Sequence, residues 1–156
     1  MKNIKEKSDY CLNCKTKPCQ KACPLGNDIP EVIEYIKDEN YKIAYKVLTK
    51  TSVLQSICGR VCPHMQQCMG KCTRGIKQNP VDIGSLEAFI GDIALNNNFS
   101  MEELDKDCVG KKVAIIGSGP SRPYMCCISS KKRCQSNNIW EKRKFGWNIK
   151  IWDSKF

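Results

Sequence analysis

CLNCKTKPCQKACP, residues 11–24, is the stretch that decides the fold, because four cysteines are crowded into it. They follow the pattern Cys-x2-Cys-x4-Cys-x3-Cys, and a proline comes directly after the last of them. Four thiols so close together indicate a metal site. Zinc sites favour two Cys-x2-Cys pairs separated by a longer spacer. The short, uneven spacing and the closing Cys-Pro are nearer to those of iron–sulfur proteins.

A second cysteine loop, ICGRVCPHMQQCMGKC, covers residues 57–72. It repeats the Cys-Pro pair and the Cys-x3-Cys spacing. In ferredoxins with two clusters, one cysteine of each run binds the other cluster, so the two loops are expected to exchange ligands. Structural zinc and, less favoured, disulfides are the alternatives. Cys58 falls outside the pattern and is interpreted as a small buried thiol.

Apolar residues spaced three and four apart predict helices within residues 28–37, 41–50, 53–59 and 84–95. Asp28 is suited to cap the first of these helices, and Pro30 suits its first turn. Residues 1–8 are interpreted as a solvated lead-in, 9–98 as an α-helical domain, and 99–110 as a linker with a short helix capped by Ser100 and Glu103. The expected fold is therefore mainly α.

The stretch KVAIIGSGP, residues 112–120, predicts the start of a nucleotide-binding unit. Its apolar run reads as a buried parallel strand, and Gly117, Gly119 and Pro120 begin the glycine-rich turn that approaches a pyrophosphate. We therefore assign residues 111–120 to the start of an FAD-binding βαβ unit. The third glycine does not follow. Instead the chain continues with Arg122, Pro123 and two adjacent cysteines.

Four linked segments resemble the family of the small (beta) subunit of bacterial glutamate synthase. They are the two cysteine loops, PVDIGSLEAFIGD, and KKVAIIGSGP, and they span residues ~9–120 in order. Relatives in that family include the N-terminal part of dihydropyrimidine dehydrogenase and the large subunit of NADH-dependent ferredoxin:NADP oxidoreductase. The resemblance implies an α-helical ferredoxin-like domain with two [4Fe–4S] clusters, ahead of Rossmann-type FAD and NAD(P)H domains.

The resemblance also implies which residues bind each cluster. One cluster takes Cys11, Cys14, Cys19 and Cys72; the other takes Cys23, Cys62, Cys68 and Glu87. Taken alone, Glu87 reads as an ordinary carboxylate on a helix flank, and the family position overturns that interpretation. The only histidine, His64, is expected to pack or to face solvent. Cys58 matches a family cysteine that is not a ligand.

Residues 121–156 are interpreted as an out-of-frame tail without stable order. Codons shifted by one base permit AGLTCAAYLAKKGAKVTIF and then GGILKYGIPN, which restore the third glycine, a helix and a family segment. The codons for Trp147-Asn148 and Trp152-Asp153 force two of these glycines. Trp140-Glu141 forces another glycine where the family carries an acidic residue for the FAD ribose, which is a departure. A divergent basic tail is the alternative.

Charge is distributed unevenly along the 156 residues, whose net charge is +10. Residues 1–110 carry 15 basic and 14 acidic side chains, whereas residues 111–156 carry 11 and 2. The positive charge therefore belongs to the tail and does not favour a nucleic-acid partner. Neither a run of about 18 apolar residues nor a signal peptide is visible, so we expect no membrane span and a cytoplasmic location.

The resemblance gives an expected function. NAD(P)H reduces FAD, the flavin passes single electrons to the clusters, and the clusters pass them to a partner such as the glutamate synthase large subunit. The chain alone is expected to lack turnover and stable FAD, since the helix that would hold the pyrophosphate is expected to be missing. A stand-alone two-cluster electron carrier and a zinc-stabilised interaction module are the competing interpretations.

Overall fold

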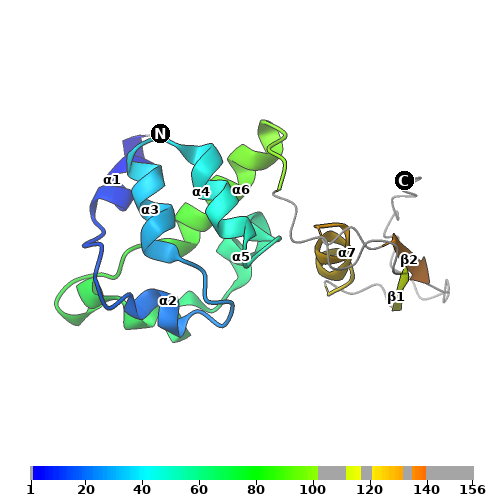
Figure 1. Cartoon of the computed structure of the whole chain (residues 1–156). Coiled ribbons are helices and arrows are strands. Elements are labelled where there is room, and N and C mark those ends of the chain that lie inside the picture. The colour runs from blue at the N-terminus through cyan, green and yellow to red at the C-terminus, as the bar shows by residue number, and fades with distance from the viewer. Residues whose placement is uncertain (1, 102–111, 117–120, 132–134, 140–156) are drawn as a thin grey trace, which may run out of the picture.

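The computed structural model describes residues 2–101, 112–116, 121–131 and 135–139. Helices form nearly all the regular structure of the first of these segments, as Figure 1 shows. The α-helices there are α1 (Lys2–Asp9), α2 (Pro18–Ala22), α3 (Ile29–Lys37), α4 (Tyr41–Thr49), α5 (Gln55–Val61) and α6 (Ile83–Asn96). Three 3-10 helices lie between α5 and α6: η1 (His64–Gln66), η2 (Met69–Lys71) and η3 (Thr73–Ile76). The expected mainly α fold is confirmed for this part of the chain.

The four helices expected from periodicity are present. Asp28 caps α3, since its Oδ1 accepts a hydrogen bond from the backbone N–H of Glu31 at 3.4 Å, and Pro30 lies in the first turn. Helices α4 and α6 begin and end within one residue of the expected bounds. Helix α5 begins two residues later than expected, at Gln55, and continues to Val61. The short α2 and the 3-10 helices of the cysteine loops have no apolar period and were not expected.

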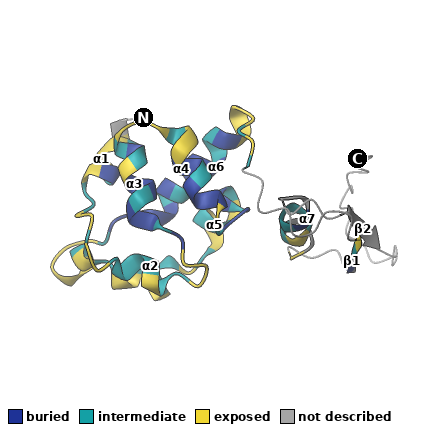
Figure 2. Ribbon diagram, viewed as in Figure 1, coloured by how far each residue is buried: buried dark blue, intermediate teal, exposed yellow. Residues whose placement is uncertain are grey.

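The hydrophobic core lies between α3, α4 and α6. Its most buried large side chains are those of Ile36, Leu86 and Ile90, which are at most 1% exposed. Figure 2 shows the buried residues gathered on the facing sides of these helices, while the segments that carry the cysteines are mostly half-buried or exposed. The scaffold is therefore an ordinary apolar core, and both cysteine loops lie against its edge.

Helix α1 occupies residues that were expected to be a solvated lead-in. It contacts α3 and α6. Ser8 is fully buried, and the Nζ of Lys7 lies 2.7 Å from the Oδ2 of Asp82. The sequence missed this helix because the segment is short and highly charged, so its single contacting face gives little apolar period.

Asp82 fastens the start of α6 and allows a stability test. Its Oδ1 accepts a hydrogen bond from the backbone N–H of Ser85 at 3.2 Å. Replacing Asp82 with alanine is expected to lower the free energy of unfolding by about 1 kcal/mol, the usual cost of losing such a cap. Denaturant unfolding measures this loss. Asp82→Asn keeps a side-chain oxygen for the cap but loses the ion pair with Lys7, so it should lose less stability than Asp82→Ala; an equal loss in both variants would contradict the capping role.

The contribution of Asp82 to the free energy of unfolding should depend on pH. Burial acts to raise the pKa of Asp82, but hydrogen bonds from Lys7 and Ser85 outweigh it and hold the pKa below its ordinary value. A carboxyl whose pKa is lowered by folding stabilises the protein above its unfolded pKa, about 3.9, and loses that contribution as the pH falls through the folded pKa. The difference between wild type and Asp82→Ala should therefore be full above about pH 4 and shrink in more acidic solution.

A small parallel βαβ unit follows. Strand β1 (Lys112–Ile116) pairs with β2 (Gln135–Ile139), with Ala114 opposite Asn137, and α7 (Ser121–Lys131) connects them. Strand β1 was expected. Residues 121–156 were expected to lack stable order, so α7 and β2 differ from the sequence-based expectation. Helix α7 can form here because the only proline of the segment, Pro123, lies in its first turn. A parallel pair also needs a crossover, which α7 supplies.

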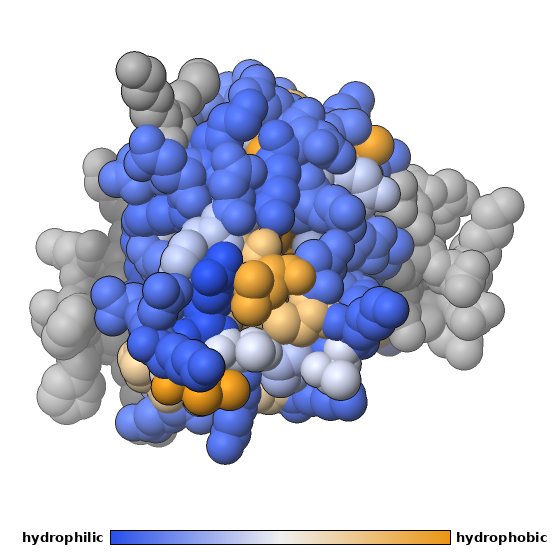
Figure 3. All heavy atoms as spheres, turned by 90° about the vertical axis from the view of Figure 1, so that its left-hand side faces the viewer, coloured by the Kyte–Doolittle hydropathy of each residue, from blue (hydrophilic) through white to orange (hydrophobic). Residues whose placement is uncertain are grey.

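Some expectations fall on residues outside those described. Gly117, Gly119 and Pro120, the expected FAD-binding turn, are among them, as is Glu103 of the expected capping box. Within the described residues no helix has the length and apolar character needed to cross a membrane. The face shown in Figure 3 is largely hydrophilic and carries a small apolar patch.

Candidate metal centres

The first group of cysteines lines one apolar pocket. Cys11, Cys14, Cys19 and Cys72 all face it. The remaining walls are largely aliphatic and come from the cysteine loop, from α3 and from the segment before α6, including Leu12, Pro18, Ile29, Ile33, Val81 and Ile83. The four residues that the family resemblance implied for one cluster are therefore brought together here, although Cys72 is more than 50 residues from the other three.

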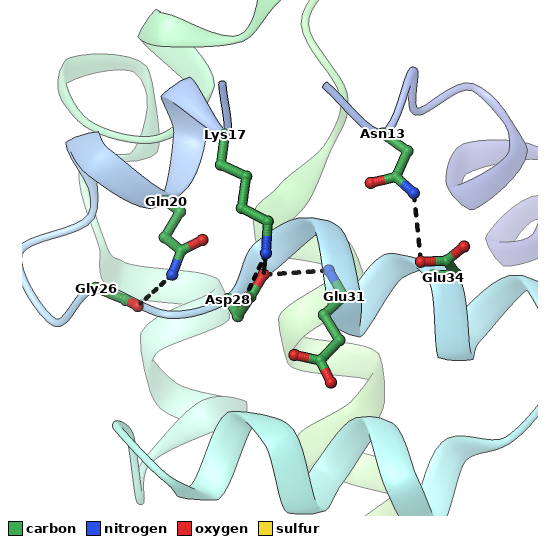
Figure 4. Close-up of polar contacts among 7 residues, drawn as sticks. All are labelled: Asn13, Lys17, Gln20, Gly26, Asp28, Glu31 and Glu34. Atoms are coloured by element: carbon green, nitrogen blue, oxygen red, sulfur yellow. Dashed lines mark hydrogen bonds and ion pairs between the residues drawn. The ribbon is translucent and has the colours of Figure 1, made fainter. Parts of the chain in front are cut away.

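Polar contacts hold the first cysteine loop against α3, as Figure 4 shows. The Nζ of Lys17 lies 2.8 Å from one oxygen of Asp28, the residue that caps α3. The side-chain amide of Asn13 donates to Glu34 at 3.3 Å. Asn13 and Lys17 both have positive φ, 46° and 45°, so the loop makes two left-handed bends between its first three cysteines. The bends turn this part of the loop around its pocket.

Burial controls the chemistry of the first group. It raises the pKa of Cys19 to about 11, and the thiols of Cys11 and Cys72 add to the effect. A neutral thiol is therefore favoured at Cys19 until a cation replaces its proton. A metal centre would supply that positive charge.

The second group lies where α5, the η helices and α6 meet. Cys62 follows the end of α5, Cys68 precedes η2, and Cys23 follows α2. Burial, with smaller effects from the charges of Cys23 and Glu87, raises the pKa of Cys68 to about 12. Burial and then Glu87 likewise raise the pKa of Cys62, with a smaller effect from Cys23. Cys23 and Glu87 thus both act on the two thiols of Cys62 and Cys68, which puts the four residues in one region of the structure.

Glu87 is the unusual member of the second group. Only 11% of its side chain is exposed, and burial raises the pKa of its carboxyl to about 7. It therefore differs from the ordinary helix-flank carboxylate that its sequence position alone suggests. His64 is the nearby partner, with its Nε2 4.0 Å from the Oε2 of Glu87. His64 was expected either to pack against the protein or to face solvent. It packs, because only 12% of its side chain is exposed.

Close packing of α5 against α6 sets the position of Cys62 relative to Glu87. A Cβ atom on Gly59 would lie 2.7 Å from the carbonyl oxygen of Gly84 and 2.8 Å from the Cα of Ala88. Gly91 is equally close to Ser56. Side chains larger than hydrogen do not fit at these contacts, so the two helices approach backbone to backbone.

An ion pair fastens the same two helices on their outer side. The Nη2 of Arg60 donates to the Oδ2 of Asp92 at 2.6 Å, and Ser56 donates to the Oδ1 of Asp92. Hydrogen bonds from Arg60 and Ser56 hold the pKa of Asp92 below its ordinary value. The ion pair between Arg60 and Asp92 was not predicted from the sequence, where the only available signal was their opposite charge on neighbouring expected helices.

The residues present fit iron–sulfur clusters. Each group combines thiols with an apolar surround, and thiolates are the ligands that such clusters take. None of the eight cysteines between residues 11 and 72 forms a disulfide. Among the described residues, no three His, Cys, Asp or Glu side chains are close enough to hold a single metal ion. A cluster of four irons is wider than one ion, so its ligands lie further apart.

Cys58 is near the second group without belonging to the expected ligands. Burial raises its pKa to about 11, and Cys62 and Glu87 contribute. It lies on α5 one turn before Cys62, so its thiol is a neighbour of the ligand positions. The structure therefore leaves the expectation that Cys58 is not a ligand as a prediction to be tested.

Comparison with known proteins relates this chain to oxidoreductases. Residues 1–99 match the family model described as dihydropyrimidine dehydrogenase domain II, 4Fe-4S cluster. The chain is 37% identical over 118 residues to the NAD-dependent dihydropyrimidine dehydrogenase subunit PreT of Escherichia coli K12, covering 76% of this chain and 28% of that protein. It is 35% identical over 117 residues to the glutamate synthase [NADPH] small chain of the same strain, covering 75% and 25%.

A third relative, the putative oxidoreductase AegA of Escherichia coli K12, is 39% identical over 112 residues, which are 71% of this chain and 17% of that protein. The match thus spans about a quarter of the length of the first two relatives and less of the third. The family model covers both cysteine loops and the helix that carries Glu87. The chain belongs to the family of dihydropyrimidine dehydrogenase domain II, whose members bind 4Fe-4S clusters.

Proposed function

We propose that residues 9–98 hold two [4Fe–4S] clusters and carry electrons between a flavin and a partner protein. The observation that carries this proposal is the sorting of the donors into two groups. Cys11, Cys14, Cys19 and Cys72 line one pocket, while the charges of Cys23 and Glu87 act on both Cys62 and Cys68. When bound, such a cluster accepts and releases one electron with little rearrangement.

The protein contributes the surroundings that make electron transfer possible. Aliphatic side chains around the first group exclude water, and burial of Cys68 and Glu87 does the same at the second. The two groups also differ in their donors, because a carboxylate replaces one thiolate in the second. Ligand type, burial and hydrogen bonds set the reduction potential, so the two clusters should have different potentials.

Iron content tests this proposal. Protein reconstituted anaerobically with iron and sulfide should bind about eight irons and an equal amount of sulfide per chain, since two four-iron clusters are expected. Reversible reduction should follow, seen as bleaching of the brown colour. Tightly bound zinc in a colourless protein would overturn the proposal and support the zinc-stabilised module.

We further propose that the electrons come from NAD(P)H through FAD in the intact protein, and that the acceptor is a partner subunit, as in glutamate synthase. The names of two relatives, an NAD-dependent subunit and an NADPH-dependent small chain, support a nicotinamide donor. Strand β1, which lies before the segment proposed to be out of frame, supports a nucleotide-binding domain beginning near residue 112. The chain as given should neither bind stoichiometric flavin nor oxidise NAD(P)H, even though α7 follows β1 where no helix was expected, because the match spans only about a quarter of the first two relatives. A yellow protein would contradict this.

Residues 121–156 are proposed to be encoded out of frame. In support, the matches to the relatives named above cover 112–118 residues and leave the rest of the chain unmatched. The DNA sequence across the codons for Pro120 and Ser121 decides the matter. An open frame that continues past GGILKYGIPN supports the proposal, whereas a confirmed stop after Phe156 with no such frame downstream supports a stand-alone electron carrier.

A further inference from the structure

His64 has an unused hydrogen-bonding atom beside the second group of donors. Its Nε2 is buried and makes no hydrogen bond. The Oε2 of Glu87 lies 4.0 Å from it, beyond hydrogen-bond distance. Both side chains are close to nine-tenths buried, so water is a poor substitute partner for either. A buried polar atom without a partner is costly and needs an explanation.

Two contacts fix His64 in this place, one to its ring and one to its backbone. A Cβ on Gly84 would lie 2.8 Å from the Cε1 and 3.0 Å from the Nδ1 of His64, so the ring rests on bare backbone of α6. Gly84 is one turn before Glu87 on that helix. On the other side, the backbone N–H of His64 donates to the carbonyl of Cys62 at 2.8 Å. The ring is therefore tied to the segment of one expected ligand and packed against the helix of another.

We propose that His64 is a positioning residue for the carboxylate of Glu87. With a cluster in place, Nε2–H would donate to Oε2 across the gap that is 4.0 Å here, and Oε1 would be left to bind iron. This inference rests on the proposed function, because it needs Glu87 as a ligand. Hydrogen bonds from outer residues to metal ligands orient those ligands and tune the metal in this way.

The arrangement has a consequence for the electronic properties of the second cluster. A donor hydrogen bond withdraws electron density from the carboxylate and so makes it a weaker donor to iron. Reduction of that cluster is then easier, and its potential lies higher than it would without His64. The first group has no histidine among its lining residues and should be unaffected.

The experiment compares four reconstituted proteins: wild type, His64→Leu, His64→Gln and Met65→Ala. Leucine fills the space without a donor, glutamine supplies an amide donor, and Met65 is an exposed neighbour that serves as the control. Each protein is titrated electrochemically while paramagnetic resonance follows the two clusters separately. Release of iron to a chelator is timed in parallel.

In His64→Leu, the second cluster should shift to lower potential and release iron about ten- to a hundred-fold faster, the usual cost of losing an outer partner. The first cluster should not change, His64→Gln should recover part of the shift, and Met65→Ala should match the wild type. Unchanged potential and release in His64→Leu would overturn the inference. So would equal changes at both clusters, which indicate a general structural defect.

Two other outcomes are separated by the same samples. Strong nitrogen coupling from an imidazole bound directly to iron in the wild type would show that His64 is itself a ligand, and would overturn the positioning role. A wild-type protein that binds no second cluster would instead overturn the proposed function. Failure of the inference and failure of the function are therefore distinguishable.

Discussion

Replacing Cys68 with alanine is expected to remove one cluster of the two and to leave about four irons on each chain, half of the full content. Cys68 is 5% exposed, and its thiol lies near Cys23 and Glu87 in the second group. Alanine has no atom that binds iron, so that group keeps three donors. The first group loses no ligand in this variant and should keep its cluster. Iron and sulfide analysis with paramagnetic resonance measures the result.

Cys58→Ala is the matched control, because this thiol is half-buried and also lies beside the second group. It should retain about eight irons, as the family position implies. Far-ultraviolet circular dichroism of both variants shows whether the helices persist. Equal iron loss in Cys58→Ala and Cys68→Ala would contradict the assignment of ligands, and loss of all iron in Cys68→Ala would contradict two independent groups.

The second large effect is expected from Gly59→Ala. The added methyl group would lie 2.7 Å from the carbonyl oxygen of Gly84 and 2.8 Å from the Cα of Ala88, and backbone atoms cannot move aside as a flexible side chain can. Overpacking of this kind costs up to about 3 kcal/mol. Helix propensity returns about 1 kcal/mol of that loss, because alanine replaces glycine within α5. The free energy of unfolding should therefore fall by about 2 kcal/mol.

The same substitution should affect the second cluster before the first. Separation of α5 from α6 moves Cys62, at the end of α5, away from Glu87 on α6. Gly75→Ala is the control, since the nearest atom to its Cβ would be that of Pro80 at an ordinary 3.6 Å. Denaturant unfolding and iron analysis are the measurements. Wild-type unfolding in Gly59→Ala would show that the helices can separate without cost.

The helical scaffold was largely predictable from the sequence, because its signals are local. Asp28 with Pro30 marked the start of α3, and the apolar period placed α6 within one residue. Helix α1 was not predictable, since its burial depends on contacts with α3 and α6 that are distant in sequence. The helix α7 and the strand β2 were missed for a similar reason. The sequences of α7 and β2 show little apolar periodicity. Strand β2 is placed by its backbone pairing with β1, which the crossover through α7 makes possible.

The cysteine groups were predictable only in part. Spacing alone marks both loops as metal sites, and it does not reveal that Cys72 joins the three cysteines of the first loop. Glu87 carries no local signal, because a glutamate beside an apolar stripe is ordinary, and its burial follows from the packing of α5 on α6. His64 was undervalued for the same reason, since its neighbour Gly84 is twenty residues further along the chain.

The order of the donors along the chain gives the proposed clusters a mechanical role. Each group combines residues from the loop before α3 with residues from beyond α5, so each cluster would act as a cross-link that closes a long loop around the α3–α4 hairpin. Closing such a loop restricts the unfolded chain and thereby favours the folded one. Oxygen damage to either cluster would remove one of the two cross-links. The segments around residues 11–27 and 58–82 would then be the first to open locally and to be cleaved by a protease.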